Sequence, residues 1–252
     1  MKNKKLNKYF SQLIKIMSIL RSKKGCPWDR KQTQKSILPY LIEETYELVE
    51  AINRNDTDEI KEELGDLLLQ VVFHSQIAKE KGRFDINDVI KELNKKLIER
   101  HPHVFAGKKG LVKAWHVREF WEKEKKKEKN RKSILDGIPE AMPALLRARR
   151  LISKAKSAGF AWKSEKGIIK KIKEELKEVE IAVNAGKKAQ IKEEIGDLLF
   201  VTVALCYFSG INPEDALQNT NKKFIKRFKK MEKFLYKGIK EKEMLELWKK
   251  TK

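Results

Sequence analysis

Residues 60–68 read IKEELGDLL, and residues 191–199 read IKEEIGDLL. Each stretch follows a Glu-Glu-x-x-Glu motif, which lies at residues 43–47 in the first half and at residues 174–178 in the second. Every acidic position of the second copy lies 131 residues after its counterpart in the first. The chain therefore contains an internal repeat, and its function is expected to depend on the repeated acids.

The spacing of the acids places them on common helix faces, because residues three apart lie one turn above each other on a helix. The segments NRNDTD at 53–58 and NAGKKAQ at 184–190 would let the chain reverse between two such helices. Each antiparallel pair would then present its carboxylates to one place. The candidate metal ligands are Glu44, Glu47, Glu63 and Asp66 in the first half and Glu175, Glu178, Glu194 and Asp197 in the second.

Converging carboxylates repel one another unless a cation lies between them, and Mg²⁺ is the hard, oxygen-seeking cation that suits such a set. The competing interpretation is a solvated helix face, which is common in a chain with 37% charged residues. Two features favour the metal site. The acids are duplicated in register, and the apolar runs LLLQVVF and LLFVTVAL that follow them place them at the edge of a core, where an unpaired charge is costly.

The composition predicts an all-α fold. The 252 residues include only 12 Gly and 6 Pro, and we find no alternating strand pattern bounded by turn signals. No apolar stretch reaches the roughly 18 residues of a membrane span, so no membrane partner is expected. The lone cysteines Cys26 and Cys206 favour a reduced, cytoplasmic setting.

A net charge of +22 raises the question of nucleic acid binding. The basic residues are spread over the whole chain, however, and no zinc-finger spacing or compact helix-turn-helix signature is found. Nucleic acid is therefore not expected as a partner.

The repeat predicts two domains, at residues 1–130 and 131–252, joined near the charged run EKEKKKEKNRK at 122–132. Within each half, GCPW at 25–28 and GFAW at 159–162 precede the acidic helices. The helices that carry the acids are expected at about 36–53, 58–81, 166–184 and 188–209. A loop is expected at 101–110 and a helix at 115–129.

A second set of residues recurs at an offset of 127, namely NKKLIER at 94–100 with NKKFIKR at 221–227, and one tryptophan in each half. A lysine and an arginine four apart could neutralise phosphate charge, and a tryptophan could stack on a base. Taken singly, each piece is more typical of a surface or packing residue. The candidate substrate-binding residues are Lys96, Arg100 and Trp121 in the first half and Lys223, Arg227 and Trp248 in the second.

These motifs, with CPWDRKQT at 26–33, ERHPHVF at 99–105 and GIPEAMPALLRARRL at 137–151, resemble the MazG family of nucleoside triphosphate pyrophosphohydrolases. The resemblance covers nearly the whole chain. It implies two tandem helical MazG-type domains, with four-helix-bundle cores completed by formation of a homodimer. It also implies Mg²⁺-dependent hydrolysis of nucleoside triphosphates to the monophosphate and pyrophosphate, with house-cleaning of non-standard nucleotides as one use.

Two further acids, Glu174 and Glu193, are left over from the metal set and could orient or deprotonate the attacking water. The alternative to an enzyme is a non-catalytic helical module that binds nucleotides or polyanions. Formation of AMP and pyrophosphate from ATP and Mg²⁺ would separate the two.

The two copies differ at positions close to the acids. Lys171, one turn before Glu175, could face the phosphates, but its counterpart in the first half is Tyr40. Glu59 in the first half corresponds to Gln190 in the second. A more negative surround weakens the binding of a triphosphate. We therefore expect the second domain to carry most of the hydrolysis.

Overall fold

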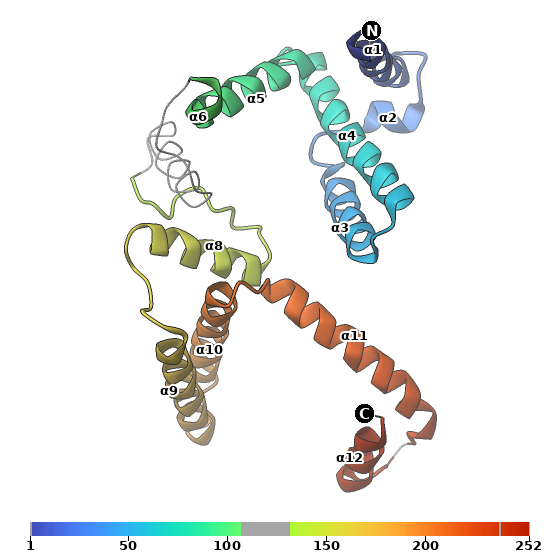
Figure 1. Ribbon diagram of the computed structural model, residues 1–252. Helices are drawn as coiled ribbons and strands as arrows, with labels where there is room; N and C mark the ends of the chain where they lie inside the picture. Colours follow the sequence, from blue (N-terminus) through green and yellow to red (C-terminus); the bar gives the residue numbers. More distant parts are fainter. Residues whose placement is uncertain (1, 107–131, 237, 252) are drawn as a thin grey trace. The chain divides into compact units, whose positions relative to one another are not determined.

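The computed structural model describes residues 2–106, 132–236 and 238–251 (Figure 1). These residues form helices, turns and bends, and no strand occurs among them, which confirms the all-α fold. They group into two compact units, one on each side of the segment 107–131. The expected domain boundary, the helix expected at 115–129 and Trp121 all fall within that segment, outside the described residues.

The first unit is built around a hairpin of two long helices, α3 and α4. The amphipathic helix α1 packs on α4, and its Met17 joins Ile37, Phe73 and Ile77 in a buried core. The helices of this unit are α1 (Lys2–Leu20), α2 (Pro27–Lys31), α3 (Leu38–Arg54), α4 (Thr57–Glu80), α5 (Ile86–Arg100) and α6 (Pro102–Phe105).

The second unit is built around the equivalent hairpin of α9 and α10. Here α8 packs on α10, as α1 packs on α4, and Ile152, Ile168 and Val203 are buried at the contact. The helices of this unit are α8 (Ala144–Ser157), α9 (Glu165–Asn184), α10 (Lys188–Phe208), α11 (Pro213–Met231), the short 3₁₀ helix η1 (Glu232–Phe234) and α12 (Glu241–Lys250).

Both hairpins turn through the same backbone geometry. Asn55 ends α3 with φ of 56°, and the aligned Gly186 follows α9 with φ of 67°. Glycine and asparagine adopt this left-handed conformation at little or no steric cost, which explains why they occupy these two positions. Asp56 then caps α4 by accepting hydrogen bonds from the backbone N–H groups of Asp58 and Glu59.

The four helices expected to carry the acids are confirmed to within about two residues at each end. The prediction of a loop at 101–110 is wrong for its first part, because Pro102–Phe105 form the short helix α6. Proline suits the first position of a helix, where its missing N–H is not needed. Among the described residues, no single helix combines the length and apolar content of a membrane span. The segments Lys188–Phe208 and Pro213–Phe234 have the length and apolar content of a span only when they are taken together, and a bend of 106° separates them.

Candidate functional site

Each hairpin brings acids from its two helices to one place. In the first unit, carboxylate oxygens of Glu44, Glu63 and Asp66 all lie within 4.8 Å of one another. In the second unit, the same holds for the aligned residues Glu175, Glu194 and Asp197. The fourth expected acid of each set, Glu47 or Glu178, lies close enough to interact electrostatically with its cluster.

Repulsion between the acids is evident in the first cluster. Partial burial and the charges of Asp66 and Glu47 raise the pKa of Glu44. Burial and the charges of Glu47 and Asp66 likewise raise the pKa of Glu63. Within the part of the chain that the structure describes, no lysine or arginine forms an ion pair with Glu44, Glu63 or Asp66. A cation placed among these oxygens would relieve the repulsion.

The second cluster already contains a cation. Lys171 lies one turn before the acids on α9, and its Nζ is 2.6 Å from an oxygen of Glu174 and 2.8 Å from an oxygen of Glu175. These contacts raise the pKa of Lys171 above its ordinary value and lower that of Glu174. Glu175 is buried, with 4% of its surface exposed, so its charge depends on such a partner. Contact with the Glu175 carboxyl raises the pKa of Glu178.

The two clusters differ in charge as the sequence suggested, except that an arginine pairs with the extra acid of the first cluster. Tyr40 occupies the position of Lys171, so the first cluster lacks the lysine. Glu59 lies near this cluster, where its charge helps to raise the pKa of Glu63. Its carboxylate also forms an ion pair with Arg54 at 2.5 Å across the hairpin turn. Arg54 thus offsets part of the surplus negative charge expected from Glu59.

Both clusters suit a divalent cation. Each offers several carboxylate oxygens from two helices, and oxygen donors of this kind are the ligands of hard divalent ions. Burial and then the neighbouring carboxylates raise the pKa values of Glu44 and Glu63, and contact with Glu175 raises that of Glu178. Of the two remaining candidate catalytic acids, Glu174 is held by Lys171, and Glu193 is exposed on α10.

The candidate substrate-binding residues of the second unit lie together on α11 and α12. Lys223, Arg227 and Thr251 line a groove of about 440 Å³ with two further lysines. The guanidinium of Arg227 lies 3.9 Å from the centre of the Trp248 indole and donates a hydrogen bond of 2.8 Å to the Trp248 carbonyl. The contacts of these residues join α11 to α12, and none of the acids lines their groove.

In the first unit, Lys96 and Arg100 are half-buried on α5, and Trp121 lies outside the described residues. No contact in the described part of the chain joins Lys96 to the acid cluster. A role for these residues in substrate binding therefore stays a prediction.

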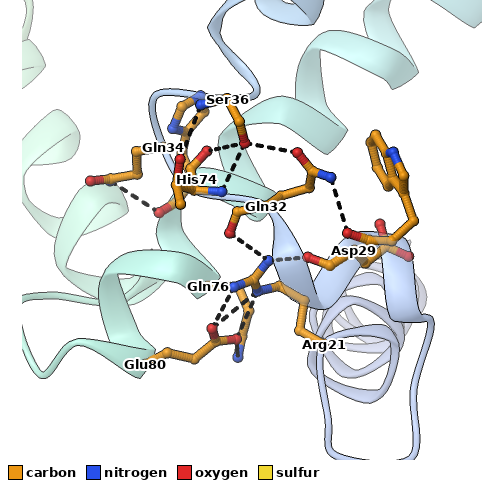
Figure 2. A network of polar contacts seen from close by, with 10 residues as sticks. Arg21, Asp29, Gln32, Gln34, Ser36, His74, Gln76 and Glu80 are labelled. Carbon is orange, nitrogen blue, oxygen red and sulfur yellow. Dashed lines mark hydrogen bonds and ion pairs between the residues drawn. The ribbon is translucent and has the colours of Figure 1, made fainter.

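Sequence reasoning missed Arg21, which fixes the segment that connects α1 to α3 (Figure 2). Only 5% of its side chain is exposed, and it donates hydrogen bonds to the carboxylate of Glu80 and to the carbonyls of Asp29 and Gln32. The amide of Gln32 in turn donates to the carbonyl of Trp28 at 3.0 Å. No local pattern marks Arg21, because its partners are up to 59 residues away in the chain.

Comparison with known proteins agrees with this geometry. The model of the MazG nucleotide pyrophosphohydrolase domain matches twice, at residues 32–105 and 163–231, and each match contains one acid cluster. A Thermotoga maritima protein named nucleoside triphosphate pyrophosphohydrolase/pyrophosphatase MazG is 51% identical over 229 residues, which cover 90% of this chain and 87% of that protein.

A nucleoside triphosphate pyrophosphohydrolase of Escherichia coli strain K12 is 42% identical over 253 residues, with 96% of each chain covered. The uncharacterized Bacillus subtilis protein YabN is 43% identical over 226 residues, which cover 88% of this chain and 46% of that protein. With two matched segments and relatives of this identity along nearly its whole length, the chain belongs to the MazG family.

Proposed function

We propose that this chain is a Mg²⁺-dependent nucleoside triphosphate pyrophosphohydrolase, which converts NTPs and dNTPs, non-standard ones included, to the monophosphate and pyrophosphate. The observation that carries the proposal is the second acid cluster. There, oxygens of Glu175, Glu194 and Asp197 converge within 4.8 Å, with Lys171 at the edge. The names of the Thermotoga maritima and Escherichia coli relatives support the same reaction.

The residues divide into ligands for a cation and groups that act on the substrate. Glu175, Glu178, Glu194 and Asp197 would hold Mg²⁺, which when bound screens phosphate charge and lowers the pKa of a coordinated water. Lys171 already contacts Glu174 and the ligand Glu175. It would exchange its contact with Glu174 for a phosphate oxygen, where its charge stabilises the charge that builds up on the phosphates.

Glu174 and Glu193 are the acids available to position the attacking water. Glu174 now pairs with Lys171, and once Lys171 has moved to the phosphate the Glu174 carboxylate would be free to accept a hydrogen bond from water. Glu193 is exposed and neighbours the ligand Glu194 on α10. The groove of Lys223 and Arg227 would contribute further phosphate contacts, with Trp248 available to a base once the side chains around it rearrange.

The first unit is proposed to hold a second site of the same type. Glu44, Glu47, Glu63 and Asp66 would be its Mg²⁺ ligands, and Lys96, Arg100 and Trp121 its substrate-binding residues. The two matched family segments and the equivalent acid cluster support this assignment. We also propose domains at 1–130 and 131–252, each of which contains one of the matched segments.

The experiment that tests the function is a product assay on the purified chain. ATP and a panel of canonical and modified dNTPs are incubated with Mg²⁺, and nucleoside monophosphate and pyrophosphate are separated by ion-exchange chromatography. We expect both products in equal amounts, no activity with EDTA, and no activity from the double variant Glu178→Ala with Glu47→Ala. Absence of both products for every nucleotide would leave the non-catalytic binding module as the better interpretation.

We further propose that the chain is a homodimer. Leu64 and Leu68 on α4 are 53% and 40% exposed, and the aligned Ile195 and Leu199 on α10 are 43% and 53% exposed. Each hairpin thus leaves an apolar stripe on the face turned away from its core. Pairing of two such hairpins into four helices is the common way to bury stripes of this kind. A monomeric mass by light scattering at micromolar concentration, with full activity, would contradict the proposal.

A further inference from the structure

The two units differ most at the level of the hairpin that lies one helical turn beyond the acids. In the first unit, Tyr40 precedes the ligand Glu44 by four residues on α3, and Gln70 follows Asp66 by four residues on α4. Because the helices are antiparallel and their acids meet, these two residues lie at the same level of the hairpin. In the second unit this level is occupied by Lys171 and Val201.

Tyr40 belongs to an aromatic pair whose surface is accessible. The rings of Trp28 and Tyr40 are 5.8 Å apart at an angle of 68°, an edge-to-face arrangement. Trp28 is 50% exposed and Tyr40 is 38% exposed. One helical turn rises about 5.4 Å, so the pair lies within the length of a nucleotide whose phosphates are at the acids. Aromatic rings at such a site stack on the face of a nucleobase.

Gln70 is a buried polar residue whose side-chain oxygen has no hydrogen-bond partner among the described residues. It is 6% exposed, and its Oε1 accepts no hydrogen bond from any residue that the structure describes. Such a group costs about 1–3 kcal/mol of stability in a folded protein. The second unit avoids this cost, because Val201 fills the equivalent place with 5% exposure and no polar atom. A side-chain amide carries both a donor and an acceptor, as the edges of nucleobases do.

The network around Arg21 fixes the backbone segment that carries Trp28, through Asp29 and Gln32 (Figure 2). Arg21 is anchored by Glu80 and donates to the carbonyls of Asp29 and Gln32, and the amide of Gln32 donates to the carbonyl of Trp28. The backbone from Trp28 to Gln32 is therefore tied through Arg21 to Glu80 of α4. A stacking surface that is ordered in advance binds its ligand without the entropy cost of ordering it.

We propose that Trp28, Tyr40 and Gln70 form a nucleobase-recognition surface that gives the first acid site a base preference which the second site lacks. This inference rests on the proposed function, because the acids must hold the phosphates of the same nucleotide. The ligand class is a nucleoside triphosphate whose base stacks on the aromatic pair and offers the Gln70 amide a donor and an acceptor. The second site relies on Lys171 and its charge instead.

The test measures binding, so that it does not depend on turnover. The full chain carrying Glu175→Gln and Asp197→Asn, which disable the second site, is titrated with the α,β-methylene analogues of ATP, GTP, CTP and UTP in Mg²⁺ by calorimetry. We expect one base to bind at least roughly tenfold more tightly than the others. Four equal affinities would overturn the proposal. If the chain binds one base preferentially but hydrolyses no nucleotide, the base-recognition surface stands and the proposed hydrolysis falls.

Variants of the surface then identify the residues responsible. Tyr40→Leu should weaken binding of the preferred analogue roughly tenfold. Tyr46→Leu, a tyrosine with 57% exposure on another face of α3, is the matched control and should change nothing. Should Tyr40→Leu fail to fold, Tyr40→Met removes the ring without adding a charge beside the acids. Unchanged affinity in either folded Tyr40 variant would overturn the proposal.

Gln70→Val separates recognition from a structural role. If the amide serves a ligand, the variant should melt at the same or a higher temperature, because it removes an unpartnered polar group, and it should reduce the preference among bases toward equality. If the amide serves the fold, the variant should melt lower and retain the preference. The second result would overturn the role of Gln70.

Discussion

Lys171 is the single side chain that most distinguishes the two acid clusters. It forms ion pairs with Glu174 and the buried Glu175 before any substrate arrives. Its contacts follow directly from the spacing of three and four residues along a helix, so the sequence was sufficient to predict them. The ion pair of Arg54 with Glu59 was not predictable in the same way, because it joins the end of α3 to the start of α4 across the turn.

Replacement of Lys171 by methionine should reduce kcat/KM for nucleoside triphosphates roughly 10- to 100-fold, because it removes a positive charge aimed at the phosphates. Without the lysine, the pKa of Glu174 should rise toward its ordinary value, so the activity that remains should fall more steeply at acid pH. Steady-state kinetics from pH 5 to 9 measures both effects. Lys173→Met on an exposed face of the same helix is the control, and equal losses in both variants would contradict a specific role for Lys171.

At the scale of elements, the segment 21–36 shows what pattern reasoning could not supply. In the sequence, CPWDRKQT at 26–33 stood out only as a motif of the family resemblance. The structure shows a short helix, α2, whose Asp29 carbonyl accepts a hydrogen bond from Arg21, and Arg21 in turn pairs with Glu80 of α4. Gly25 is needed in this turn because a Cβ there would lie 2.1 Å from the Leu20 carbonyl oxygen. Contacts of this range depend on tertiary structure, whereas the long helices follow from periodicity alone.

Loss of the Arg21–Glu80 contact should destabilise the first unit in a pH-dependent manner. Arg21 lowers the pKa of Glu80 below the ordinary value of 4.5, so the unfolded chain binds more protons than the folded one in acid. The stabilisation is therefore complete above about pH 4.5 and is lost as the pH falls through the lower, folded pKa. Arg21→Met should cost about 2 kcal/mol near pH 7, where it leaves two carbonyls and a carboxylate without their donor.

Urea denaturation of the wild type, Glu80→Gln and Glu59→Gln at several pH values measures this difference. The gap between wild type and Glu80→Gln should be largest near neutral pH and should close in acid. Glu59→Gln is the control, because Glu59 contacts the more exposed Arg54. A gap that stays constant across the whole pH range would contradict the linkage.

At the scale of the whole molecule, the internal repeat was the most informative feature of the sequence. Two acid hairpins in register predicted two helical units, and the structure contains both. The repeat could not predict the partner helix of each hairpin, since α1 and α8 share no obvious motif although each packs on the second hairpin helix. The repeat also could not predict that Gln70 is buried, and its burial is what makes this side chain a candidate for recognition.

The apolar stripes lead to a prediction about assembly. Leu199→Glu places a charge in the middle of the exposed stripe of α10, where burial against another hairpin would be strongly unfavourable. We expect the variant to sediment as a monomer at concentrations at which the wild type is a dimer, with unchanged helical circular dichroism. Lys192→Gln, at an exposed position near the start of the same helix, changes the net charge by the same single negative unit and is the control. A dimeric Leu199→Glu protein would exclude this stripe as the interface.

The last prediction concerns the division of labour between the two units. Arg54 offsets part of the extra charge of Glu59, so the asymmetry now depends mainly on Lys171 and its counterpart Tyr40. A site without a cation beside its acids should bind a triphosphate with lower affinity, whatever its base preference. Glu178→Ala should therefore abolish most of the hydrolysis of ATP, whereas Glu47→Ala should leave most of it, with both proteins fully helical. If Glu47→Ala instead loses most of the activity, phosphate charge is neutralised in the first unit by groups other than a lysine on α3.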